Sequence, residues 1–386
     1  METLAGNTIE ELTELRHELH RLAELSGEEY KTSNRIRRLL EGCAPDRLLE
    51  GIGGEGIIAV FEGSREGPCV MIRCELDALP IPEENEISYR SKTEGVAHKC
   101  GHDGHMAIVA GVARYLQDHN PRAGEVHLLF QPAEETGQGA ARVLDDHKFR
   151  AVEPDFIFAL HNLPGYPLKQ VLLRDGVFAS ASRGYEVILK GETAHAAHPE
   201  RGRSPAMALA ALIQQFSAFP QFYASLDQAA KATVIHSKLG EVAFGTSPGY
   251  AEFRATLRTY ENELMEALCE RAEDTVSNIA QTYGLQADTR WTERFEATRS
   301  DAGCNAYIEE SARRAGLELT RKETPFAWSE DFGRFTSRYK GAIFGLGAGV
   351  DQPPLHAGSY DFPDALISPG VSMFIHILNQ ITGFEQ

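Results

Sequence analysis

Residues 98–116 read HKCGHDGHMAIVAGVARYL, a cluster of metal-binding residue types followed directly by an apolar segment. In the apolar half, small and branched residues recur at three- and four-residue spacing and predict a helix from Met106 to Leu116. Short apolar runs precede and follow this helix, at Val70–Leu76 and Val126–Phe130. Runs without polar alternation are typical of strands buried on both faces. The order strand, helix, strand therefore indicates an α/β fold with an at least partly parallel sheet.

The flanking sequence extends this sheet and then interrupts it. Phe156–Leu160 and Ala342–Leu346 are two further buried strands, and leucines from Leu12 to Leu22 predict an amphipathic helix packed on the sheet. The middle of the chain alternates differently, as strand, helix, strand, strand, helix, strand: Tyr185–Leu189, Ser204–Phe219, Ala232–Lys238, Ala251–Thr259, Leu264–Tyr283 and Gln286–Trp291. This order is the ferredoxin-like split motif. We therefore expect a compact insert at residues 182–292, within a larger domain built from residues 1–181 and 293–386.

Composition and charge exclude several classes of protein. The chain has 386 residues with 38 Lys+Arg against 56 Asp+Glu, a net charge of −18 that argues against nucleic-acid binding. No apolar run approaches the roughly 18 residues of a membrane span, and the start METLAGNTIEELTEL lacks the layout of a signal peptide. The six cysteines are scattered rather than spaced as a disulfide framework. These features predict a cytoplasmic protein with reduced thiols.

The stretch 98–105 holds more chemically active side chains than packing requires. Gly101 and Gly104 would let the backbone turn tightly, so that Cys100 and His102 converge on one point. The helix N-terminus and the adjacent Lys99 would favour a thiolate at Cys100. A lone cysteine or histidine is more often a buried thiol or a solvated loop residue, and the cluster argues against that interpretation.

Other candidates follow the ends of the predicted strands. Asp77 comes after the 70–76 strand, Glu134 and Glu135 after the next, and His161 and His356 after the last two. Ligands in open α/β sheets gather at this edge. Taken singly, the two acids would suit a solvated helix start, and each histidine a core or loop position. Five residues together offer sulfur, nitrogen and oxygen donors suited to Zn, Mn, Co or Ni: Cys100, His102, Glu135, His161 and His356. Five ligands exceed one tetrahedral site and predict a two-metal centre.

These motifs carry a resemblance. The segments KCGHDGH, QPAEETGQGA, LHNLPGYP, TAHAAHPERGRSP and WSEDF resemble the metal-dependent amidohydrolases related to aminoacylase and carboxypeptidase G, in the hippurate hydrolase and indole-acetyl-amino-acid hydrolase branch. The resemblance runs from about residue 10 to the C-terminus. It implies a binuclear catalytic domain with a mixed, largely parallel sheet, interrupted by a smaller lid domain through which such chains form homodimers.

The resemblance also implies roles for individual residues. It makes Cys100 the ligand that bridges two divalent ions, which are Mn or Zn, with Co or Ni as alternatives. The other ligands that it implies are His102, Glu135, His161 and His356. Glu134 becomes the general base, which the sequence alone does not separate from Glu135. Asp77 supports a metal-site residue within the catalytic set. His195 matches a lid histidine that stabilises the oxyanion, and its alternative is an exposed loop residue. Arg258 matches an arginine that could hold a substrate carboxylate, and its alternative is an exposed strand arginine paired with an acid.

The implied reaction is metal-dependent hydrolysis of the amide bond of an N-acyl or N-aroyl amino acid, releasing a carboxylate and a free amino acid. The chain departs from the usual sequence of this branch at three places: Glu75 replaces Asp, Lys99 replaces a small residue, and Thr193-Ala194 replace glycines. These departures affect the expected substrate and remove none of the metal ligands. Three alternatives stay open: a dipeptidase or carboxypeptidase on the same centre, a cysteine hydrolase using Cys100 with His102 or His105 as base, and a non-catalytic binding protein.

Overall fold

The computed structural model describes residues 6–385, so residues 1–5 and 386 of the predicted catalytic domain lie outside the described residues. The helices are α1 (Gly6–Leu22), α2 (Tyr30–Gly42), α3 (His102–Leu116), α4 (Gly139–Asp145), α5 (Ala206–Tyr223), α6 (Asn262–Thr282), α7 (Ala302–Ala315), α8 (Gly333–Thr336) and α9 (Ile367–Ile381), with 3-10 turns η1 (Phe149–Ala151), η2 (Pro199–Arg201) and η3 (Asp364–Leu366). The strands are β1 (Arg47–Ile52), β2 (Gly56–Glu62), β3 (Cys69–Glu75), β4 (Glu125–Gln131), β5 (Phe156–Pro164), β6 (Val171–Leu173), β7 (Gly176–Ala179), β8 (Ala181–Lys190), β9 (Ala194–His195), β10 (Ala230–Leu239), β11 (Thr246–Ser247), β12 (Tyr250–Thr259), β13 (Gln286–Phe295), β14 (Thr298–Ser300), β15 (Leu319–Arg321) and β16 (Lys340–Gly349).

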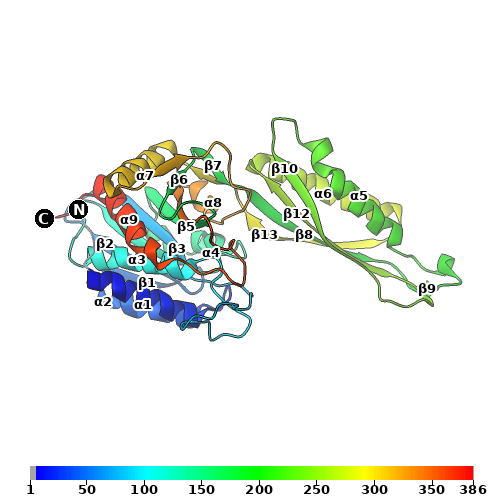
Figure 1. The fold of residues 1–386 in the computed structure, drawn as a ribbon. Helices are drawn as coiled ribbons and strands as arrows, with labels where there is room; N and C mark the ends of the chain where they lie inside the picture. The colour runs from blue at the N-terminus through cyan, green and yellow to red at the C-terminus, as the bar shows by residue number, and fades with distance from the viewer. Residues whose placement is uncertain (1–5, 386) are drawn as a thin grey trace. The chain divides into compact units, whose positions relative to one another are not determined.

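The chain divides into two compact units. The first contains the residues up to Phe178, Thr298–Pro325 and the chain from Asp331 onward. The second contains Ala179–Ala297 and the short return segment Phe326–Glu330. Figure 1 shows that the second unit holds the green and yellow segments of the middle of the chain. Each unit has its own main sheet.

The first unit is built on an eight-stranded sheet in the order β1-β2-β4-β3-β5-β16-β6-β15. Its centre is a block of parallel strands, because β3 pairs in parallel with β4 and β5, and β16 with β5. The β1–β2, β2–β4 and β16–β6 pairs are antiparallel. The expected mixed, largely parallel α/β sheet is confirmed. The carboxyl ends of β3, β4, β5 and β16 therefore meet at one edge.

Helices bury this sheet and fix α3 against its centre. Helices α3 and α9 pack on β3 and on each other, and α1 packs against α3. One continuous apolar core joins these helices to the strands, with Leu12 of α1, Val109 of α3 and Phe374 of α9 almost inaccessible to solvent. Figure 1 shows α1, α3 and α9 together on this unit. The cysteine and histidine cluster thus begins on a helix anchored in the core.

Two of the predicted element boundaries that were wrong lie next to the candidate ligands. Helix α3 begins at His102, four residues before the predicted Met106, so His102 and His105 are helical. Gly101 does turn, with φ +93°, but Gly104 lies within the helix, where a Cβ atom would meet the ring of Phe362 at 2.4 Å. Strand β5 continues to Pro164, so that His161 lies inside the strand and not after it. Burial of polar residues by tertiary contacts caused both errors.

The second unit has the expected element order, β8-α5-β10-β12-α6-β13. Its strands form an antiparallel sheet in the order β10-β12-β8-β13, the arrangement of a ferredoxin-like fold. On β12, the alternate residues Ala251, Phe253, Ala255 and Leu257 are buried, and both helices pack on this strand. The intervening residues face the opposite side and are less buried. One sheet face is therefore covered by helices and the other is open.

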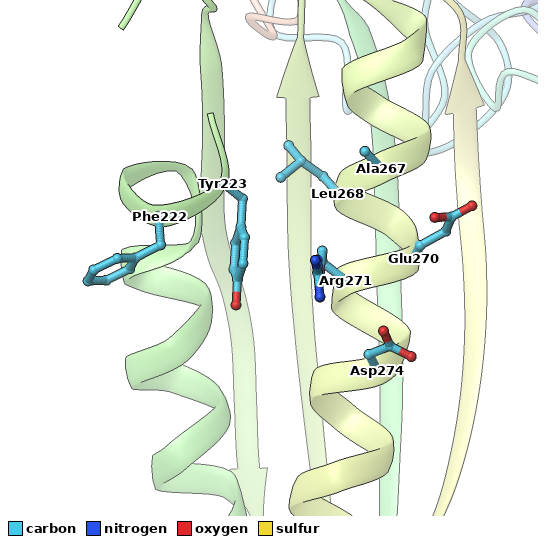
Figure 2. A pocket seen from close by; sticks show the side chains of 7 residues that line it. All are labelled: Phe222, Tyr223, Ala267, Leu268, Glu270, Arg271 and Asp274. Carbon is cyan, nitrogen blue, oxygen red and sulfur yellow. The ribbon is translucent and has the colours of Figure 1, made fainter. Parts of the chain in front are cut away.

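A hollow of ≈580 Å³ lies between the end of α5 and α6. Figure 2 shows Tyr223 next to α6, while Phe222 points away from that helix. The guanidinium of Arg271 lies 5.7 Å from the centre of the Tyr223 ring, within the range of a cation–π contact.

Among residues 6–385, no helix combines the length and apolar character that a membrane span requires.

Candidate metal centre

The chemically active residues of the first unit converge at the carboxyl edge of its parallel strands. Asp77 follows β3, and the pair Glu134 and Glu135 follows β4. His161 lies in the last half of β5, and His356 lies in the loop beyond β16. Cys100 and His102 stand at the start of α3, which connects β3 to β4. The structure thus brings together every candidate that the sequence placed in this unit.

The donors form two groups that share one sulfur atom. Cys100, His102 and His161 each offer a ligand atom within 4.8 Å of the others, and Cys100, Glu135 and His356 form a second such group. The Cys100 Sγ and His161 Nε2 atoms are 3.5 Å apart, and His356 Nε2 lies 3.7 Å from Glu135 Oε2. Two ligands held at ~2.1 Å from one tetrahedral ion would lie about 3.4 Å apart. The separations fit a divalent ion in each group.

Backbone carbonyl groups fix the orientation of two histidine rings. The Nδ1 atom of His102 lies 2.9 Å from the carbonyl oxygen of Asp77, and that of His161 lies 2.9 Å from the carbonyl oxygen of Asn162. A carbonyl oxygen only accepts, so Nδ1 carries the proton in both rings. Each Nε2 atom faces the donor groups, and His102 Nε2 is buried with no hydrogen-bond partner among the described residues. This is the arrangement of metal-binding histidines.

Buried acids give the site a strong negative character. Burial opposes protonation of His102, but its interaction with Asp77 and the charges of Glu75 and Glu135 raise its pKa to about 10. The Asp77 carboxylate accepts hydrogen bonds from Ser26 Oγ at 2.6 Å and from the amide of Glu135 at 3.0 Å. Burial opposes ionisation of Asp77, and contact with His102 lowers its pKa nonetheless. A cation is therefore favoured among these groups.

The turn that carries Glu134 and Glu135 is held by a residue the sequence did not single out. Ala133 has φ +52°, a conformation that non-glycine residues rarely adopt, and its amide donates to Glu29 Oε1 at 2.8 Å. Glu29 is fully buried, and this burial raises its pKa to about 7. The Oε1 atom of Glu134 accepts a 3.3 Å hydrogen bond from the amide of Asp331. Nothing periodic in the sequence marks Glu29.

His356 is also held in a strained backbone conformation. Its φ is +66°, and its amide donates to the carbonyl oxygen of Lys99 at 2.8 Å. The ammonium group of Lys99, which we expected to favour a thiolate at Cys100, pairs with Glu83 and donates to the carbonyl oxygen of Tyr360 at 2.8 Å. Strained conformations of this kind persist where surrounding contacts determine them, and they concentrate at functional sites.

His105 lies beside the donors, but both of its ring nitrogens are used elsewhere. Its Nδ1 atom is 2.7 Å from Glu75 Oε2, and its Nε2 atom accepts from the amide of Asn162 at 3.3 Å. Burial opposes ionisation of Glu75, while the adjacent Arg73 and then His105 lower its pKa. Arg73 pairs with Glu75 and Asp331. His105 therefore does not serve as a base for Cys100, whose thiol lies against His161.

The remaining two candidates belong to the second unit. His195 is exposed on β9, where its Nδ1 atom accepts a 3.1 Å hydrogen bond from the amide of Ala197. Arg258 is half-buried on β12 and donates to the carbonyl oxygen of Ala327 at 3.1 Å and to Ser329 Oγ at 2.9 Å. Burial lowers the pKa of this guanidinium.

Comparison with known proteins agrees with this geometry. The model of "Peptidase family M20/M25/M40" matches residues 71–380. The chain belongs to this family. An N-acetylcysteine deacetylase of Bacillus subtilis is 30% identical over 87% of this chain and 88% of its own length, and an N-acetyldiaminopimelate deacetylase of Geobacillus is 28% identical over 96% and 97%. Among solved structures, the YXEP protein of Bacillus subtilis, described as a dinuclear metal-binding peptidase of family M20, matches with a TM-score of 0.80 and 26% identity, covering 97% of this chain and 98% of that one.

Family membership and the donor groups together define the class of enzyme. The chain is a metal-dependent amidohydrolase, as the resemblance implied. The two candidate ligand groups that contain Cys100 and a dinuclear relative support two divalent metal ions per chain.

Proposed function

We propose that the chain hydrolyses the amide bond of an N-acyl or N-aroyl amino acid at a two-metal centre, in which Cys100 would be the ligand common to both ions. The observation that carries this proposal is the sharing of the Cys100 thiol by both donor groups. His102 and His161 complete the first group, and Glu135 and His356 the second. Sulfur, nitrogen and oxygen donors in this combination suit Mn or Zn, with Co or Ni as alternatives.

In this mechanism Glu134 is the general base. Divalent ions bound here supply Lewis acidity and lower the pKa of a water molecule. Glu134 takes a proton from the attacking water and returns it to the leaving amine, so that the C–N bond breaks and a carboxylate and a free amine form. Its position supports this role, because Glu134 Oε2 lies 3.9 Å from His102 Nε2 while Glu134 Oε1 is oriented by the amide of Asp331. Asp77 positions His102 and the Glu135 amide.

The substrate proposal comes from the relatives and from the second unit. Both deacetylases named above act, by their names, on N-acetylated amino acids or amino-acid derivatives. In our proposal His195 stabilises the oxyanion and Arg258 binds the carboxylate of the leaving amino acid, with the second unit acting as a lid. Small dipeptides cleaved at the same centre are the second candidate, because the same contacts would serve them.

Metal analysis coupled to a hydrolysis screen tests the proposal. We expect close to two transition-metal ions per purified chain, and hydrolysis of N-acetyl, N-benzoyl or indole-acetyl amino acids that chelation abolishes and Mn, Zn or Co restores. Cys100→Ala should lower metal content as well as rate, because a bridging thiolate contacts both ions. A fully active preparation with at most one ion, or a Cys100→Ala variant that keeps two, contradicts the model. A cysteine hydrolase would keep its activity after chelation.

The proposal includes a homodimer that works in the cytoplasm. Strand β10 is at the end of its sheet, and its Ile235 and Leu239 side chains are 60% and 41% exposed. Exposed apolar side chains on an unpaired edge strand favour pairing with a second copy. None of the six cysteines forms a disulfide bond, as expected in a reducing compartment. Sedimentation velocity of the wild type and of Ile235→Lys tests the interface, since a wild-type monomer would refute it.

A further inference from the structure

The second unit contains a small cavity with two positive charges. It has a volume of ≈220 Å³ and is lined by alanines and uncharged polar side chains, Tyr260 among them, together with Lys231 and Arg258. Lys231 on β10 and Arg258 on β12 are direct cross-strand partners in the antiparallel sheet. Side chains in such a pair leave the same face with Cβ atoms ~5 Å apart, and like charges there are destabilising. The pair therefore favours an anion between the two groups.

The acid whose charge acts on this pair is Glu293, which opposes the lowering of the Arg258 pKa by burial without forming an ion pair. On the same open face of the sheet, Arg254 and Arg290 both pair with Glu186. Within residues 6–385, by contrast, no carboxylate lies within the 4.0 Å ion-pair distance of Lys231 or Arg258. The sheet thus balances its neighbouring arginines and leaves these two cations available to a ligand.

The two cations differ in exposure and geometry. The Arg258 guanidinium is half-buried, and its bonds to Ala327 and Ser329 hold it in place with uncharged acceptors. Burial lowers its pKa, and the charge of Glu293 opposes this change. Lys231 is exposed and carries a compact charge on a flexible stem. A planar guanidinium suits a bidentate carboxylate, whereas an ammonium suits a second, less constrained one.

We propose that this cavity binds a small dicarboxylate, so that the preferred amino acid released by the enzyme carries an acidic side chain. This rests on the proposed function, in which Arg258 binds the α-carboxylate. Lys231 then binds the side-chain carboxylate and acts as a specificity-determining residue. A dianion neutralises both members of the cross-strand pair at once, which a monocarboxylate cannot do.

Isothermal titration calorimetry on the full-length, metal-loaded protein tests the binding, with glutarate as probe and pentanoate as the five-carbon monocarboxylate control. Lys231→Gln should weaken glutarate binding ~10-fold, the value of one charge-assisted contact, and pentanoate binding much less. Lys238→Gln is the matched control, because Lys238 lies on the same strand and pairs with Glu241. Its glutarate affinity should stay within ~2-fold of the wild type.

Kinetics separate failure of this inference from failure of the proposed function. Lys231→Gln should raise KM for N-acetylglutamate ~10-fold relative to KM for N-acetylalanine, with little change in the ratio of their kcat values. Hydrolysis of both substrates with an unchanged KM ratio overturns the inference alone. Equal loss of glutarate affinity in Lys231→Gln and Lys238→Gln also overturns it, since general surface charge would then explain binding. No hydrolysis of any acyl amino acid, with glutarate binding still dependent on Lys231, refutes the proposed function.

Discussion

His20 makes the stability of the first unit depend on pH. Its ring lies in α1, fully buried, with Nδ1 2.8 Å from Asp103 Oδ2 and Nε2 2.7 Å from Glu83 Oε2. Both nitrogens face carboxylates, so the ring is an imidazolium. Burial opposes this charge, but the two acids, Asp103 foremost, raise the pKa of His20 to about 9.

A pKa raised from 6.5 to about 9 corresponds to about 3 kcal/mol of stabilisation. Because the folded-state value is the higher one, this stabilisation is complete below pH 6.5 and disappears as the pH rises through about 9. His20→Gln removes the titrating group. We therefore expect the wild type to lose about 3 kcal/mol more unfolding free energy than the variant between about pH 6 and about pH 9.5.

Urea unfolding followed by far-UV circular dichroism measures this difference. Both tryptophans, Trp291 and Trp328, lie in the second unit, so their fluorescence reports on that unit and should change little with the variant. His147→Gln is the control, because its side chain is 86% exposed. The reasoning is refuted if His20→Gln and the wild type lose stability equally over this pH range.

Two further predictions concern the reaction. Glu134→Gln should keep both metal ions and lower kcat by roughly 10²–10⁴-fold, whereas Glu135→Gln should lower metal content; the opposite pattern would exchange the two roles. His195→Ala should lower kcat and kcat/KM together by roughly 10²–10³-fold, and near-wild-type kcat in metal-loaded protein would rule out an oxyanion role.

The sequence predicted the location of the centre because the ends of parallel strands obey a simple rule. Asp77, Glu135 and His356 each follow a strand of the central block, and an apolar run of strand length is easy to recognise. The parallel pairing of β3, β4, β5 and β16 then brings their carboxyl ends to one edge without any knowledge of side-chain contacts. Residues at these ends converge whatever the intervening loops do.

The start of α3 and the residues supporting the ligands could not be predicted in the same way. His102, Asp103 and His105 resemble a polar loop in sequence, yet all three are buried and helical. Their burial depends on ionic partners far away in the chain, such as His20 for Asp103 and Glu75 for His105. No period in the sequence connects these partners, because α1, α3 and β3 meet only in the folded unit.

Lys99 shows how such contacts determine the geometry of the centre. Its carbonyl oxygen accepts from the amide of His356, and its ammonium group holds Glu83 and the carbonyl oxygen of Tyr360. Lys99 precedes Cys100 in the chain and therefore fixes the loop that carries His356. Cys100 and His356 belong to one proposed metal group. A ligand set is effective when other contacts hold it in position before the metal arrives. In the branch that this chain resembles, a small residue is usual at position 99. The ammonium group of Lys99 thus distinguishes this chain, and its contacts stabilise the backbone near both Cys100 and His356.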